Sequence, residues 1–172
     1  MFELTKLGWS SFQQLCLSIT REILGQTVES FLDTYDGGRD GAFIGNWKAI
    51  GQEGLSGKFV IQCKFTSREN HNIIASDLED EISKVKRLVS TNNCDSYILM
   101  TNAGVTGKQA EEINKQFQDA GVKYFQIFGK TWINQQILEN KRLRMLVPRV
   151  YGIGDLSQIL DERAYAQTLS IL

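Results

Sequence analysis

The sequence predicts a single α/β domain in which a mixed β-sheet is flanked by helices. From the third expected strand onward, amphipathic and extended segments alternate along the chain, in the order helix, strand, helix, strand, helix. The length of 172 residues fits one domain with a core large enough to fold without disulfides or a structural metal. A hydrophobic fraction of 42% and a charged fraction of 23% are those of an ordinary globular protein.

The N-terminal part of the chain predicts one helix followed by two extended segments. Apolar residues recur at helical spacing over residues 10–24, and Gly25 ends the pattern. Residues 27–35 and 41–50 are expected to be extended. Asp36, Gly37 and Gly38 predict a tight turn between them, because glycine readily adopts the positive φ that such turns need.

The clearest strand covers residues 58–66, KFVIQCKFT, which are rich in β-branched and aromatic side chains. A flexible connection is expected before it, at 51–57. A helix is expected after it, over 76–88, with Ser76 and Glu79 spaced as a capping box.

The remaining part of the domain is expected to contain two strands and two helices. The apolar run at 95–101 predicts a strand that is buried on both faces. The other three elements are a helix, a strand and a helix, expected at 106–120, 122–128 and 130–140.

The C-terminal segment is expected to lie outside this domain. Pro148 is the only proline and is followed by two glycines, which predicts a linker over 147–154 before a further amphipathic segment. We expect residues 1–146 to form one domain, and 147–172 to be a linker and a helix that lead to the next domain of a longer protein. The alternative is a terminal helix that packs back on its own domain.

Composition excludes several kinds of site. The three cysteines are widely spaced without a CxxC pair, so neither a disulfide framework nor a cysteine zinc site is expected. The single His71 excludes sites that need two imidazoles, and a net charge of -1 provides no global basic field. Neither a signal-peptide core nor an apolar run of roughly 18 residues is present, so we expect a cytoplasmic protein without membrane contact.

One group of polar residues suggests chemistry. Gln62 and Lys64 are separated by one residue on the clearest strand, so their side chains share one face while Cys63 faces the other way. A hairpin between the second and third strands would bring Asp40 to the same face. Oxygens of Asp40, Gln62 and the Cys63 backbone suit Mg²⁺, and Lys64 would stabilise charge on a phosphodiester attacked by metal-bound water. The simpler alternative is that Asp40 caps a turn and Lys64 is a solvated strand residue.

Three segments carry a resemblance to a known family: SFQQLCLSITREILG, DGGRDGAF and FVIQCKF. Together they resemble the Mrr-type branch of the PD-(D/E)XK restriction-endonuclease superfamily, and YILMTNAGVTGKQAEE extends the resemblance to about residues 7–140. The resemblance implies a restriction-endonuclease-like fold. It assigns Asp40 as the metal-binding aspartate, Gln62 as the glutamine that replaces a glutamate, and Lys64 as the catalytic lysine.

One position departs from the family pattern. The family often has a glutamate after the aromatic residue of the first helix, whereas Gln13 follows Phe12 here. Gln13 can still hold a metal-bound water but brings no charge. Glu22 is a rival acid, and at about 100° per residue it is expected on the opposite side of the apolar stripe.

The resemblance implies a Mg²⁺-dependent endonuclease acting on double-stranded DNA, with Mn²⁺ as a substitute. Similar domains often stand before STAND-class signalling NTPases in prokaryotic antiviral defence proteins. We therefore expect an antiphage effector that is activated when the full-length protein self-associates. The alternatives are a catalytically inactive nucleic-acid-binding or assembly module of the same fold, and an RNA nuclease.

Overall fold

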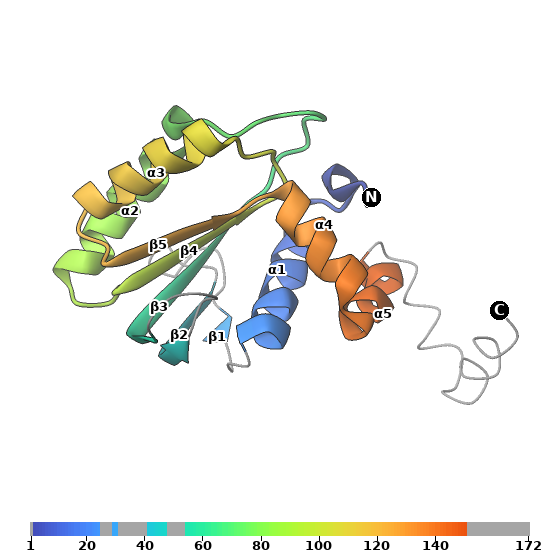
Figure 1. The fold of residues 1–172 in the computed structure, drawn as a ribbon, viewed down its shortest axis with the longest axis horizontal. Helices are drawn as coiled ribbons and strands as arrows, with labels where there is room; N and C mark the ends of the chain where they lie inside the picture. The colour runs from blue at the N-terminus through green and yellow to red at the C-terminus, as the bar shows by residue number, and fades with distance from the viewer. Residues whose placement is uncertain (1, 25–28, 31–40, 48–53, 151–172) are drawn as a thin grey trace, which may run out of the picture.

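The computed structural model describes residues 2–24, 29–30, 41–47 and 54–150. In this part of the chain, five strands form one mixed sheet in the order β1-β2-β3-β4-β5, with helices on both of its faces (Figure 1). The predicted α/β fold with a mixed, helix-flanked sheet is confirmed.

The sheet combines an antiparallel and a parallel half. β1 pairs with β2 and β2 with β3 in the antiparallel sense, whereas β3, β4 and β5 run parallel. The parallel half arises because a helix connects each strand to the next. The first predicted strand is described only at residues 29–30, and the connection expected at 51–57 is already strand from residue 55. The strands are β1 (Glu29–Ser30), β2 (Gly41–Trp47), β3 (Leu55–Lys64), β4 (Ser96–Thr101) and β5 (Tyr124–Phe128).

The helices predicted before residue 147 are present, with two local corrections. A 3₁₀ turn precedes the helix expected at 76–88, and the Asp77 carboxylate, not Ser76, accepts a hydrogen bond from the backbone N–H of Ile74, at 3.0 Å. The linker expected from residue 147 is helical up to residue 150. The helices are η1 (Leu4–Lys6), α1 (Trp9–Leu24), η2 (Ala75–Leu78), α2 (Glu79–Ser90), α3 (Gly107–Asp119), α4 (Lys130–Glu139) and α5 (Lys141–Val150).

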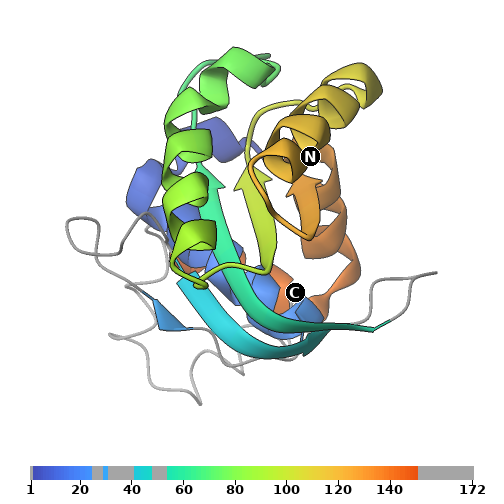
Figure 2. The same ribbon diagram turned by 90° about the vertical axis from the view of Figure 1, so that its left-hand side faces the viewer.

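Two apolar cores lie on the two faces of the sheet. Side chains alternate along β3, so Phe59, Ile61 and Cys63 pack beneath α1, α4 and α5, whereas Val60 packs beneath α2 and α3. Figure 2 shows α2 and α3 side by side over one face of the sheet. β4 is buried at every position, which confirms the prediction of a strand covered on both faces.

The C-terminal helix α5 belongs to the first of these cores. Leu143 is fully buried there, and Leu146 packs against the same cluster. This packing supports the helix up to residue 150 and through Pro148, which lies in its last turn. Residues 151–172, and with them the expected terminal helix, lie outside the described residues. In the described part of the chain, no helix is both long and apolar enough to span a membrane.

Candidate active site

The candidate site lies at the carboxyl end of β3, on the face covered by α2. Gln62 and Lys64 share this face, and Cys63 is buried in the core on the other side, as strand alternation predicts. Gln62 is 8% exposed, whereas the Lys64 side chain is 35% exposed. Of these two polar residues of β3, Gln62 therefore lies in the interior and Lys64 lies near the surface.

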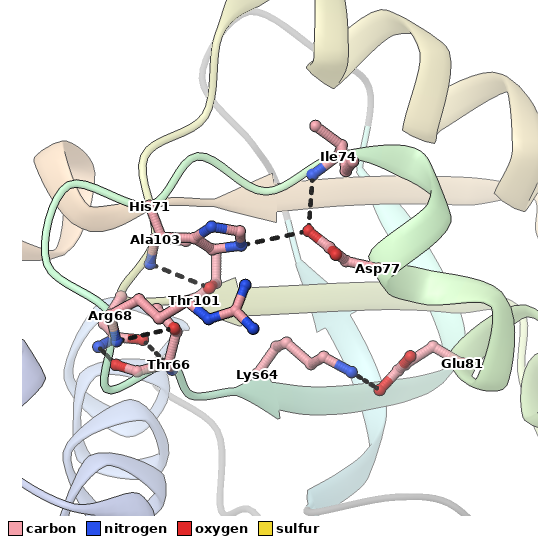
Figure 3. Close-up of polar contacts among 10 residues, drawn as sticks. Lys64, Thr66, Arg68, His71, Ile74, Asp77, Glu81, Thr101 and Ala103 are labelled. Atoms are coloured by element: carbon pink, nitrogen blue, oxygen red, sulfur yellow. Dashed lines mark hydrogen bonds and ion pairs between the residues drawn. The ribbon is translucent and has the colours of Figure 1, made fainter.

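Lys64 is held by a carboxylate from the neighbouring helix. Its Nζ donates a hydrogen bond of 2.9 Å to Oε1 of Glu81 in the first turn of α2 (Figure 3). The Glu81 side chain is only 6% exposed, and within the described residues its second oxygen, Oε2, is buried and accepts no hydrogen bond. A buried carboxylate is costly without a charged partner, so Lys64 compensates it.

Sequence reasoning missed Glu81, although a signal was present. Leu78, Glu81, Val85 and Leu88 recur at helical spacing, and all four are buried. Glu81 therefore occupies a core position in an otherwise apolar stripe. A carboxylate at such a position needs a partner from the surface that the helix covers, and here that surface is β3.

The segment after Lys64 is fixed by the strand next to it. The side chain of Asn102, which follows β4, accepts a hydrogen bond from the Thr66 N–H at 2.8 Å and donates one to the Thr66 carbonyl at 2.7 Å. Further along, the Gly104 N–H donates to the His71 carbonyl at 2.8 Å. These contacts hold the chain beyond Lys64 against the end of the sheet.

A groove of about 330 Å³ opens beside Lys64, and we call it the β3 groove. Its titratable lining residues are Lys64, Arg68, His71 and Asp77, and Thr101 also contributes to its lining. The His71 Nε2 lies 3.2 Å from Oδ2 of Asp77, and Figure 3 shows Arg68 beside this pair. Basic side chains in a groove next to Lys64 can bind the phosphates of a nucleic-acid backbone.

The other predicted site residues have different outcomes. Asp40 lies outside the described residues. Its neighbour in the chain, Gly41, begins β2 and pairs with Ile61, directly before Gln62. Gln13 is half-buried on α1, whose apolar side packs on the opposite face of the sheet, and its role stays a prediction. The proposed metal contact of the Cys63 backbone carbonyl also stays a prediction.

Glu22, the rival acid, lies toward the end of α1. Its Oε2 is 3.8 Å from an Arg142 guanidinium nitrogen on α5. This contact ties Glu22 to the helical layer opposite the face that carries Lys64.

The residues of this face fit a divalent cation by the chemistry of their donors. Gln62 brings an amide oxygen to the side of β3 that carries Lys64, and Mg²⁺ prefers such hard oxygen ligands. Within the described residues, no cluster of three or more His, Cys, Asp or Glu side chains could hold a metal by itself. A site here therefore needs a contribution from substrate oxygens, from water or from residues outside the described ranges.

Comparison with protein families identifies the class of this domain. Residues 4–125 match the model of the restriction endonuclease family Mrr_cat. This matched region is more than half of the chain. The chain belongs to this restriction endonuclease family, and its matched part is a nuclease domain. A comparison with curated proteins gives no match.

Proposed function

We propose that the protein is a metal-dependent endonuclease that hydrolyses phosphodiester bonds in double-stranded DNA. The observation that carries the proposal is the placement of Lys64. Its ammonium lies at the end of β3 in a nuclease family domain, beside the basic β3 groove. This is where a positively charged donor can stabilise charge that develops on a phosphate.

The proposed metal is Mg²⁺, with Mn²⁺ as a substitute. Asp40, the Gln62 amide oxygen and the Cys63 backbone carbonyl would hold it, in keeping with the oxygen ligands that Mg²⁺ prefers. When bound, the ion supplies Lewis-acid chemistry at the phosphodiester. Gln62 is buried next to Lys64 on the strand, so its amide is held in place by the core.

Lys64 and the β3 groove would perform the remaining tasks. A lysine ammonium has three donors, and the contact with Glu81 uses one of them. The others can bind a non-bridging phosphate oxygen and orient the attacking water. Arg68 and His71, which line the same groove, would bind neighbouring phosphates and align the strand.

The biological setting is proposed from the family resemblance of the sequence. In this proposal the domain is the nuclease effector of a cytoplasmic antiviral defence protein. Residues 147–172 would connect it to a STAND-class NTPase, and self-association of the full-length protein would activate cleavage by placing two nuclease domains on one duplex.

Plasmid cleavage tests the enzymatic proposal. The protein is incubated with Mg²⁺ or Mn²⁺, alone and fused to an oligomerising domain, beside Asp40→Ala, Lys64→Ala and an EDTA control. Lys58→Ala is the matched control, because Lys58 lies on the same strand and its ammonium contacts the exposed Asn92 carbonyl. We expect metal-dependent cutting that is lost in the first two variants and kept in Lys58→Ala.

A non-catalytic module is the second candidate. It is favoured by the neutral amides of Gln13 and Gln62, which bring no charge to a metal, and by the engagement of Lys64 with Glu81. DNA binding by the oligomerised wild type, without cutting in either metal, would support this candidate. Offering RNA and DNA of equal length in the same assay distinguishes an RNA nuclease.

A further inference from the structure

We propose that Glu81 is a positioning residue for Lys64, which it holds at the end of β3 in the orientation that cleavage requires. The inference rests on the proposed nuclease function and assigns a role to a residue of α2. The carboxylate oxygen and the ammonium nitrogen are 2.9 Å apart, the distance of a direct charge-assisted hydrogen bond.

The difference in burial shows which partner positions the other. Glu81 is 6% exposed and lies in the buried stripe of α2 between Leu78 and Val85, so the core fixes its carboxylate. The Lys64 side chain is 35% exposed and has a flexible four-carbon stem. The fixed acid therefore restricts the mobile lysine.

The arrangement leaves Lys64 accessible to a substrate. Lys64 lines the β3 groove together with Arg68 and His71, whereas Glu81 is not among the residues that line it. Glu81 therefore contacts the ammonium from the protein side, and the groove gives DNA access from the solvent side. A single contact from behind fixes the ammonium without occupying the donors that face the groove.

The cost of burying Glu81 is also explained by this role. Replacing a buried ion pair with apolar residues is often neutral or stabilising, so such a pair is weak evidence for stability alone. At this position an apolar side chain would continue the stripe of Leu78, Val85 and Leu88. A carboxylate there serves to orient Lys64, because correct placement of a reacting group contributes strongly to rate.

Steady-state cleavage by three variants of the oligomerised protein tests the proposal. Glu81→Gln keeps the shape and removes the charge, Glu81→Asp keeps the charge on a shorter stem, and Glu79→Gln removes an exposed charge from the same turn. We expect Glu81→Gln to lower kcat by about 10–100-fold, with KM for DNA and the half-saturating Mg²⁺ concentration within about two-fold of the wild type. Glu81→Asp should recover part of the rate, and Glu79→Gln should match the wild type.

Two results of that assay would overturn the proposal. Wild-type kcat in a folded Glu81→Gln protein would show that Lys64 needs no anchor. Recovery of kcat at high Mg²⁺, with the half-saturating concentration raised ten-fold or more, would make Glu81 a metal ligand instead. Circular dichroism of each variant confirms that a lost rate does not reflect unfolding.

A second readout separates this proposal from the nuclease proposal itself. Acetylation of Lys64 by a soluble active ester, followed by mass spectrometry, should be several-fold faster in Glu81→Gln, because an ammonium engaged by a carboxylate is less available. Lys58 in the same sample is the internal control. Equal Lys64 rates in both proteins would overturn the positioning contact. Absence of cleavage by the wild type would instead overturn the nuclease function, and with it the catalytic use of the contact.

Discussion

The ion pair between Lys64 and Glu81 predicts an asymmetric effect on stability. Replacing Lys64 with methionine leaves the Glu81 carboxylate buried without its charged partner, at 6% exposure. Replacing Glu81 with leucine leaves Lys64 at 35% exposure, where its ammonium can reach water. We therefore expect Lys64→Met to destabilise the fold more than Glu81→Leu.

The exposures set the expected magnitudes. Removing one partner from a fully buried pair costs roughly 3–5 kcal/mol, and the partial exposure of Lys64 reduces this to about 2–3 kcal/mol for Lys64→Met. For a domain of this size, that lowers Tm by about 4–12 °C. Glu81→Leu should cost about 0–1 kcal/mol, because leucine joins the apolar stripe of α2. The double variant should lie within about 1 kcal/mol of the wild type, since no charge remains buried.

Urea unfolding at pH 7, monitored by circular dichroism, measures these differences in the free energy of unfolding. The comparison requires that this free energy falls with urea concentration at the same slope in every variant. Lys58→Met is the control for loss of a strand lysine, since its ammonium donates a hydrogen bond to the exposed Asn92 carbonyl. The reasoning is refuted if Glu81→Leu costs as much as Lys64→Met, or if the double variant is as unstable as the sum of the two single ones.

Two further predictions concern the scaffold. The backbone N–H of Lys58 and the ammonium of Lys123 hold the pKa of Asp95 below its ordinary 3.8. The ionised carboxylate therefore adds to the free energy of unfolding above pH 3.8, and this contribution is lost as the pH falls through the lowered pKa. Because Asp95 is partly exposed, Asp95→Asn should cost about 0.5–1 kcal/mol at pH 7, and the difference should disappear in urea unfolding near pH 2; a difference that persists there would contradict this account. Phe117 is fully buried and stacked 4.2 Å from Phe125, so Phe117→Ala should lose about 3–5 kcal/mol, and a loss below about 1 kcal/mol would show that the core closes over the cavity.

Local covalent geometry made part of the site predictable. Side chains on a strand alternate between faces whatever the rest of the fold does, so the shared face of Gln62 and Lys64 followed from their spacing alone. The buried nature of β4 followed in the same way from its continuous apolar run. The restriction-endonuclease-like class was also expected from short segments of sequence, and the family match confirms it.

Long-range packing decided what the sequence pattern left open. Leu143 and Leu146 pack against the core and support helix α5 up to residue 150, although Pro148 suggested a linker. The β3 groove likewise depends on the contacts of Asn102 and Gly104, which lie far along the chain from Lys64.

By itself, the sequence determined the fold class, the order of most elements and the two residues of β3 that share the face of the candidate site. Only the tertiary structure decided that Glu81 meets Lys64. The two residues are 17 positions apart and lie on different elements. Which side of α2 faces the sheet, and how far along β3 the helix lies, are set by close packing of both apolar surfaces rather than by any local preference of the chain.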